Sequence, residues 1–246
     1  MDHDTRIGGA SSRFPATQHS VIEAAQSPDD AERRRAWDLL VAAYWKPCYK
    51  YIRLKWRASN EEAKDLTQGF FARAVEKDFF RSYDASKGSF RNFMRVCLDG
   101  FVANERQSAQ RLKRGGEFVI TALEFETAEG ELRQLDIADP FSIEDYFHRE
   151  WVRSVFALAI DRFRDATATT KPKHFAVFQS YDLADGERRT YQQIAAELDL
   201  SVSDVTNYLH WARKEFRRTV LDTLRELTAS DREFDEDARF LLRGER

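Results

Sequence analysis

Apolar residues recur at steps of three and four along most of this 246-residue chain, which is the spacing of one buried face of an α-helix. Patterns of this kind cover residues 31–56, 60–80, 90–114, 144–163, 171–183 and 191–218. The chain has only ten glycines and five prolines, too few for a sandwich or barrel built from many tight turns. The pattern therefore predicts an all-α fold.

Two helices with a tight turn between them are predicted at residues 191–218. The turn falls at Asp199, a residue type that tolerates left-handed backbone better than most. Ser201 has the character of an N-cap, and Asp204 follows three residues later, where the acid of a capping box belongs. The segment is therefore predicted to form a helix-turn-helix.

The second helix of this motif has a polar face that is suited to DNA. Short polar side chains come first and cations follow: Ser203, Thr206, Asn207, His210, Arg213, Lys214 and Arg217, with Arg189 and Arg218 as further phosphate contacts. Such short side chains can contact base edges in a major groove, and the cations can bind phosphates. A basic last turn also occurs in helices that never contact DNA, because the helix dipole favours cations there. The motif as a whole favours DNA binding over that alternative.

Charge is strongly segregated along the chain, although the net charge is only −3. Residues 90–114 hold six Lys or Arg against two acids, a local charge of +4, and residues 115–150 hold ten acids against two Arg, a local charge of −8. Alternating blocks of this kind indicate modules with different partners. The small net charge argues against a free-standing DNA-binding protein, since such proteins usually carry a basic excess.

These blocks predict an order of segments along the chain. The predicted segments are a disordered tail at residues 1–12, a first helical domain at 13–114, an acidic linker at 115–143, a second helical domain at 144–228 and an acidic C-terminal tail at 229–246.

Several functional classes are disfavoured by what the sequence lacks. Cys48 and Cys97 do not have the spacing of a metal site, and the five histidines are scattered, so neither a metal site nor a disulfide framework is expected. We find no glycine-rich phosphate loop and no nucleophile–base pair, so we expect no enzyme and no cofactor. No apolar run approaches the length of a membrane span, and no signal-peptide core is visible, so a cytoplasmic protein without a membrane partner is expected.

Four short motifs resemble bacterial RNA polymerase sigma factors of the sigma-70 family. Residues 62–71, EAKDLTQGFF, resemble the helix that binds core polymerase, and residues 83–93, YDASKGSFRNF, resemble the loop and helix that melt the promoter. Residues 14–20, FPATQHS, are similar to the FPxTxWS stretch of one branch of the extracytoplasmic-function (ECF) subfamily, with His19 in place of Trp. Residues 231–242, DREFDEDARFLL, resemble the C-terminal ending of that branch. With the helix-turn-helix, the resemblance covers most of the chain in the family's order.

The resemblance implies a non-catalytic subunit that binds core RNA polymerase and directs it to promoter DNA. In the family, an acidic helix binds a basic coiled coil of the largest polymerase subunit; the matching residues are Glu62, Asp65, Gln68 and Phe71. The first domain would also bind and open the −10 element, where single-stranded bases stack on aromatic side chains in a basic groove. Candidates for that role are Tyr83, Lys87, Arg91, Arg95, Asn104, Arg106, Gln107, Arg111 and Arg114. The helix-turn-helix would read the −35 element while resting on the flap of the second-largest subunit.

The sequence departs from the family pattern at Lys64 and Gly69, where the family often has acids. Each lost acid weakens attraction to a basic partner, and Lys64 adds repulsion. One hypothesis is that core binding is conditional, with phosphorylation of Thr67 or Ser59 by a Ser/Thr kinase restoring about −2 of charge. The alternative is that Lys64 points to solvent and changes little. An anti-sigma protein is left open as another regulator.

Two other functions stay open at this point. A stand-alone helix-turn-helix regulator would use the same DNA-binding face, but it leaves the acidic helix, the loop motif and the linker without a role. A sigma-mimic interaction module would capture an anti-sigma protein and start no transcription.

Overall fold

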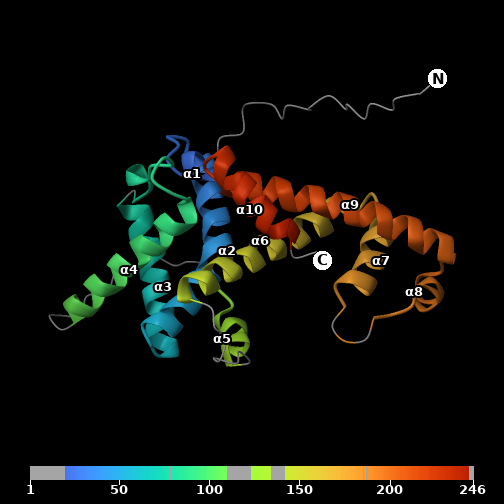
Figure 1. The fold of residues 1–246 in the computed structure, drawn as a ribbon, viewed down its shortest axis with the longest axis horizontal. Helices are drawn as coiled ribbons and strands as arrows, with labels where there is room; N and C mark the ends of the chain where they lie inside the picture. The colour runs from blue at the N-terminus through green and yellow to red at the C-terminus, as the bar shows by residue number, and fades with distance from the viewer. Residues whose placement is uncertain are drawn as a thin grey trace, which may run out of the picture.

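The structure is a computed structural model, and it describes residues 20–77, 79–109, 123–133, 142–184, 186 and 188–243. Every regular element in these ranges is a helix, so the all-α prediction is confirmed for this part of the chain (Figure 1). The elements are α1 (Val21–Ala24), α2 (Asp30–Lys55), α3 (Asn60–Glu76), η1 (Phe79–Ser82), α4 (Phe90–Ala109), α5 (Phe125–Arg133), α6 (Ile143–Thr167), α7 (Pro172–Asp182), α8 (Tyr191–Leu198), α9 (Val202–Leu227) and α10 (Asp231–Arg243). None of the described helices is both long enough and apolar enough to cross a membrane.

A first hydrophobic cluster is built around α2. The buried side chains of α1, α3, α4 and α5 pack against α2, and they are joined by the first half of α6, where Phe147 and Trp151 are almost completely buried. The end of α9 completes the cluster with Val220 and Leu224. Helix α10 adds Leu241.

A second, smaller cluster lies at the other end of α6 and α9. Its buried side chains come from the end of α6, from α7 and α8, and from the first half of α9. Phe163 is the contribution of α6, and its ring packs edge-on against Phe175 and Phe178 of α7. Figure 1 shows α6 and α9 running side by side between the helices of the two clusters.

The division between the clusters therefore falls inside α6 and α9, not between residues 143 and 144. Along α6 it lies between Ala159, in the first cluster, and Phe163, in the second. Along α9 it lies between Ala212 and Val220, with Phe216 packed against both clusters. The periodic pattern shows which residues are buried, but it does not show that one long helix serves two cores.

Part of the predicted acidic linker is a packed helix. Helix α5 buries Phe125 and Ala128 against the first cluster. Its buried Glu129 receives hydrogen bonds from Arg53 of α2 at 2.9 and 2.7 Å and from Tyr49 at 2.7 Å. Because Arg53 of α2 neutralises Glu129, this part of residues 115–143 packs against the first cluster in spite of its acidic composition.

The predicted acidic tail at 229–246 likewise contains a packed helix. Residues 231–243 form α10, which folds back beside α9 (Figure 1). Glu233 and Asp237, on its inner side, are 4% and 2% exposed. Two of the acids that give this segment its acidic composition are therefore buried.

Candidate nucleic-acid interface

The helix-turn-helix has the turn and the caps that the sequence predicted. Asp199 ends α8 in left-handed backbone with φ 51°, and the amide of Leu200 donates to the carbonyl of Ala195 at 2.9 Å. Ser201 caps α9 by accepting from the amide of Asp204, whose carboxylate accepts in return from the amide of Ser201. The Ser201 hydroxyl also donates to the Asp204 carboxylate at 2.6 Å, and this hydrogen bond, with the one from the Ser201 amide, lowers the pKa of the Asp204 carboxyl.

One face of α9 gathers the predicted DNA contacts. Val205, Leu209 and Ala212 point into the second cluster. The candidates are all exposed on α9: Ser203, Thr206, Asn207, His210, Arg213, Lys214 and Arg217. We refer to these seven side chains as the α9 face. Its order, short polar groups and then cations, is the order that suits base edges followed by phosphates.

At least three of the predicted phosphate contacts are already paired, and one of them, Arg218, pairs with Glu215 on α9 itself. Arg213 donates to both carboxylate oxygens of Asp182 at 2.9 and 2.8 Å and lies over the ring of Tyr181, which links α9 to α7. The bonds to Asp182 raise the pKa of this guanidinium. Arg189 pairs with Glu197 of α8 at 2.5 Å. Arg213 and Arg189 therefore brace the motif as well as lying on its surface.

The predicted polymerase-binding side of α3 is only partly exposed. Asp65 is exposed and Gln68 is half-exposed, while Glu62 pairs with Arg106 of α4 at 2.9 Å. Phe71 is completely buried, so the structure removes it from the candidate contacts. Its ring belongs to the first cluster and packs edge-on against Phe70.

The departures at Lys64 and Gly69 have local structural reasons. Lys64 pairs with Glu61 on the surface at 3.0 Å. A Cβ atom added at Gly69 would lie 3.3 Å from the ring of Phe101, so the small residue allows α3 and α4 to approach closely. An acid at this position would therefore disturb the packing of α3 against α4.

Only one of the two predicted phosphorylation sites is on the surface. Thr67 is 0% exposed, and its hydroxyl donates to the carbonyl of Ala63 at 2.7 Å. A kinase cannot reach this hydroxyl in the folded chain, which corrects the expectation for Thr67. Ser59 is exposed, and its side chain caps α3 by accepting from the amide of Glu62 at 3.2 Å.

The candidates for −10 binding differ in exposure and in pairing. Asn104 and Gln107 are exposed, and Lys87 is exposed while it pairs with Asp84 at 3.6 Å. Four other candidates are held by partners within the chain. The hydroxyl of Tyr83 donates to the carbonyl of Gly88, and Arg91 pairs with Asp237. Arg95 pairs with Asp99 and Glu144, and Arg106 pairs with Glu62. Arg111 and Arg114 lie outside the described residues, as do residues 14–19 of the N-terminal motif at 14–20. Sequence reasoning missed Asp237 as the partner of Arg91, because the two are 146 positions apart.

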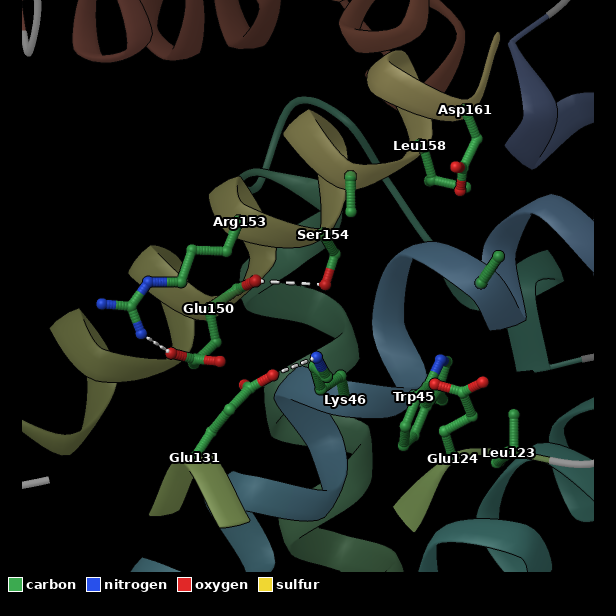
Figure 2. Close-up of a pocket in the computed structure, with 12 residues that line it drawn as sticks. Trp45, Lys46, Leu123, Glu124, Glu131, Glu150, Arg153, Ser154, Leu158 and Asp161 are labelled. Atoms are coloured by element: carbon green, nitrogen blue, oxygen red, sulfur yellow. Dashed lines mark hydrogen bonds and ion pairs between the residues drawn. The ribbon is translucent and has the colours of Figure 1, made fainter. Parts of the chain in front are cut away.

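A cavity of about 780 Å³ lies between α2, α5 and α6 (Figure 2). Four of its charged side chains form pairs: Lys46 with Glu131 at 2.6 Å, and Glu150 with Arg153. The completely buried Lys50 lies 2.5 Å from a carboxylate oxygen of Glu131 and 2.5 Å from one of Glu150. Burial tends to raise the pKa of Glu131, but the hydrogen bonds from the two lysines outweigh it and lower that pKa. This network fastens α5 and α6 to α2.

In the part of the chain that the structure describes, no group of His, Cys, Asp or Glu side chains is arranged to hold a metal ion. Neither known protein families nor curated proteins contain a match to this chain.

Proposed function

We propose that this protein is a sigma factor of the ECF type, which binds core RNA polymerase and directs promoter recognition and transcription initiation in the cytoplasm. The observation that carries the proposal is the α9 face, where a capped helix-turn-helix presents seven polar and basic side chains together. The motif resemblances along the chain supply the polymerase part of the proposal.

In this proposal the two clusters have different tasks. The first cluster carries the polymerase-binding side of α3 and the −10 candidates of α4, and the second carries the α9 face for the −35 element. An inter-domain linker would include the segment that contains α5. A Ser/Thr kinase acting at Ser59 and an anti-sigma protein remain the proposed regulators.

Core binding would be electrostatic at the exposed side of α3. Asp65 is an exposed acid there, and Gln68 lies one turn further along. Glu62 would add its charge while it stays paired with Arg106. A basic coiled coil would meet these groups on the polymerase, and opposite charges of this kind raise the association rate and fix the orientation.

Transcription with purified core RNA polymerase and genomic fragments tests the proposal. We expect run-off transcripts whose start sites share two upstream sequence elements. Asp65→Arg should weaken binding to core polymerase, whereas Asp165→Arg, a matched change of an exposed acid on α6, should not. A chain that never associates with core polymerase would refute the proposal.

The same α9 face supports a second candidate, a stand-alone helix-turn-helix regulator. That function predicts tight and specific binding to duplex DNA without polymerase. A sigma-mimic module would capture an anti-sigma protein and would start no transcription. Footprinting with and without core polymerase, beside the transcription assay, separates the three.

A further inference from the structure

Helix α10 covers the N-terminal end of α4. The carboxylate of Glu233 accepts from the backbone amide of Phe90, the first residue of α4, at 2.9 Å, and from the amide of Ala229 at 3.1 Å. The first amides of a helix have no partner within the helix, and they attract negative charge. Glu233 therefore occupies the position where the N-terminus of α4 would otherwise bind an anion.

A second carboxylate of α10 holds the first cation of α4. Nη1 of Arg91 donates to both oxygens of Asp237, at 2.8 and 2.7 Å, and Nε2 of His148 lies 3.6 Å from the same carboxylate. The guanidinium also lies over the ring of Trp151, 4.9 Å from its centre. Burial tends to raise the pKa of Asp237, but His148 and Arg91 outweigh it and keep that pKa below its usual value. Asp237 is therefore ionised at neutral pH.

Apolar contacts keep α10 in this position. The ring of Phe240 stacks on His148 with the ring centres 4.4 Å apart, and Leu241 is buried in the first cluster. Arg225 of α9 lies over the ring of Phe234 at 3.9 Å. The contact is modest in size, however, because Phe240 remains 45% exposed and the outer side of α10 carries exposed charges. A short helix held in this way can be displaced by a competing ligand.

The groups that hold these carboxylates are those that bind phosphate. A helix N-terminus, a guanidinium and an imidazole together make a site for a phosphate group, and a guanidinium binds phosphate and carboxylate oxygens in the same geometry. Tyr83, whose ring packs against Phe90 at this end of α4, adds an aromatic side chain beside the site. The arrangement has the elements of a binding site for single-stranded nucleic acid, a backbone anion site next to an aromatic ring.

We propose that α10 is an autoinhibitory lid: its Glu233 and Asp237 occupy an anion-binding site at the N-terminus of α4, and nucleic-acid phosphates must displace them to bind there. The choice of nucleic acid as the ligand rests on the proposed function. In the closed state Asp237 takes up Nη1 of Arg91 and the arginine side chain is only 16% exposed, so little of the guanidinium is open to a −10 strand. A chain that is free of polymerase would then bind DNA weakly at this site.

Two matched double variants test the lid. Glu233→Gln/Asp237→Asn removes the two buried charges and keeps the shape of the side chains. Asp235→Asn/Glu236→Gln removes two exposed charges from the same helix, so the net charge changes equally. Binding of a labelled single-stranded DNA oligonucleotide is measured by fluorescence anisotropy without polymerase. If the lid is closed about nine-tenths of the time, the first variant should bind about tenfold more tightly than the wild type, and the control should bind like the wild type.

Hydrogen exchange of the wild-type chain gives a second readout that needs no variant. Saturating oligonucleotide should speed exchange in residues 231–243 and slow it at the start of α4, because the lid leaves as the strand enters. Equal affinities of both variants, or exchange in residues 231–243 that does not change on DNA binding, would overturn the lid. If the first variant does not fold, the exchange result decides alone.

The lid and the proposed function can be tested separately. Binding of the same proteins to core polymerase is measured in parallel, and it depends on α3 in the proposal. Faster exchange and tighter DNA binding without any polymerase binding would support the lid and refute the sigma-factor role. Polymerase-dependent transcription, together with hydrogen exchange in residues 231–243 that does not change on DNA binding, would support the sigma-factor role and refute the lid.

Discussion

Replacing Lys50 by methionine should destabilise the protein strongly, because this lysine is a buried charge shared by three helices. Its ammonium group is 0% exposed and lies 2.5 Å from both Glu131 of α5 and Glu150 of α6. The Lys50→Met variant keeps the length of the side chain but leaves the completely buried Glu150 with Arg153, which is 63% exposed, as its remaining cation. Removing one partner of a buried pair costs about 3–5 kcal/mol, and the remaining arginine places the expectation near the lower end, about 3 kcal/mol.

Urea and thermal unfolding followed by circular dichroism measure this loss. For a chain of this size 1 kcal/mol shifts Tm by about 2–4 °C, so a loss of about 3 kcal/mol should lower Tm by about 6–12 °C. Lys46→Met is the matched control, because Lys46 lies nearer the surface and such pairs contribute about 0–1 kcal/mol. The double variant Lys50→Met/Glu150→Gln should recover part of the loss, because no buried charge is then left without its partner.

The reasoning is refuted if Lys50→Met unfolds within about 1 kcal/mol of the wild type, the scale expected for an exposed pair. It is also refuted if the double variant is as unstable as the sum of its two single changes. Either result would mean that α5 and α6 are not fastened to α2 through this network.

Four shorter predictions concern the other sites. Lys214→Ala should lower the slope of log affinity against log salt concentration by about one and leave the preferred DNA sequence unchanged. Asn207→Ala should instead change the preferred sequence, and titrations of duplex DNA at several salt concentrations measure both effects. Thr67→Glu should cost about 3 kcal/mol or more in urea unfolding, because it places a charge in the interior, and a well-folded variant with raised polymerase affinity would contradict its burial. Burial raises the pKa of the Cys97 thiol to about 11, so its alkylation by iodoacetamide should be slow near neutral pH. The alkylation rate should rise about tenfold per pH unit up to pH 11, and a rate at neutral pH equal to that of a free thiol would contradict the raised pKa. Asp199→Ala should cost about 1 kcal/mol, because alanine is strained at φ 51°, and Asp199→Gly should be at least as stable as the wild type in the same unfolding assay.

The parts that sequence reasoning predicted correctly depend on neighbours along the chain. The turn at Asp199 and the capping box of Ser201 and Asp204 form within a few residues, so their residue types are enough to predict them. The exposure of the α9 face follows from the same local periodicity. The all-α fold follows from the pattern of the long helices.

The parts that sequence reasoning missed depend on distant partners. Glu233 and Asp237 meet residues 143 and 146 positions away, so nothing near them shows that these acids are buried. Phe71 was a candidate because the resemblance carried it over, and Thr67 because a phosphate there would restore charge. Helix α3 packs against both α2 and α4, and both side chains are buried.

The shared helices α6 and α9 leave no place where the molecule could be cut into two self-sufficient halves. At about 1.5 Å per residue, their 25 and 26 residues make rods about 38 Å long that run in opposite directions between the two clusters. A fragment that stops before α9 would lack Val220 and Leu224 of the first core, and a fragment that starts after α6 would lack Phe163 of the second. Truncation at either point should therefore give an insoluble or molten product, and denaturation of the intact chain should proceed as one cooperative event.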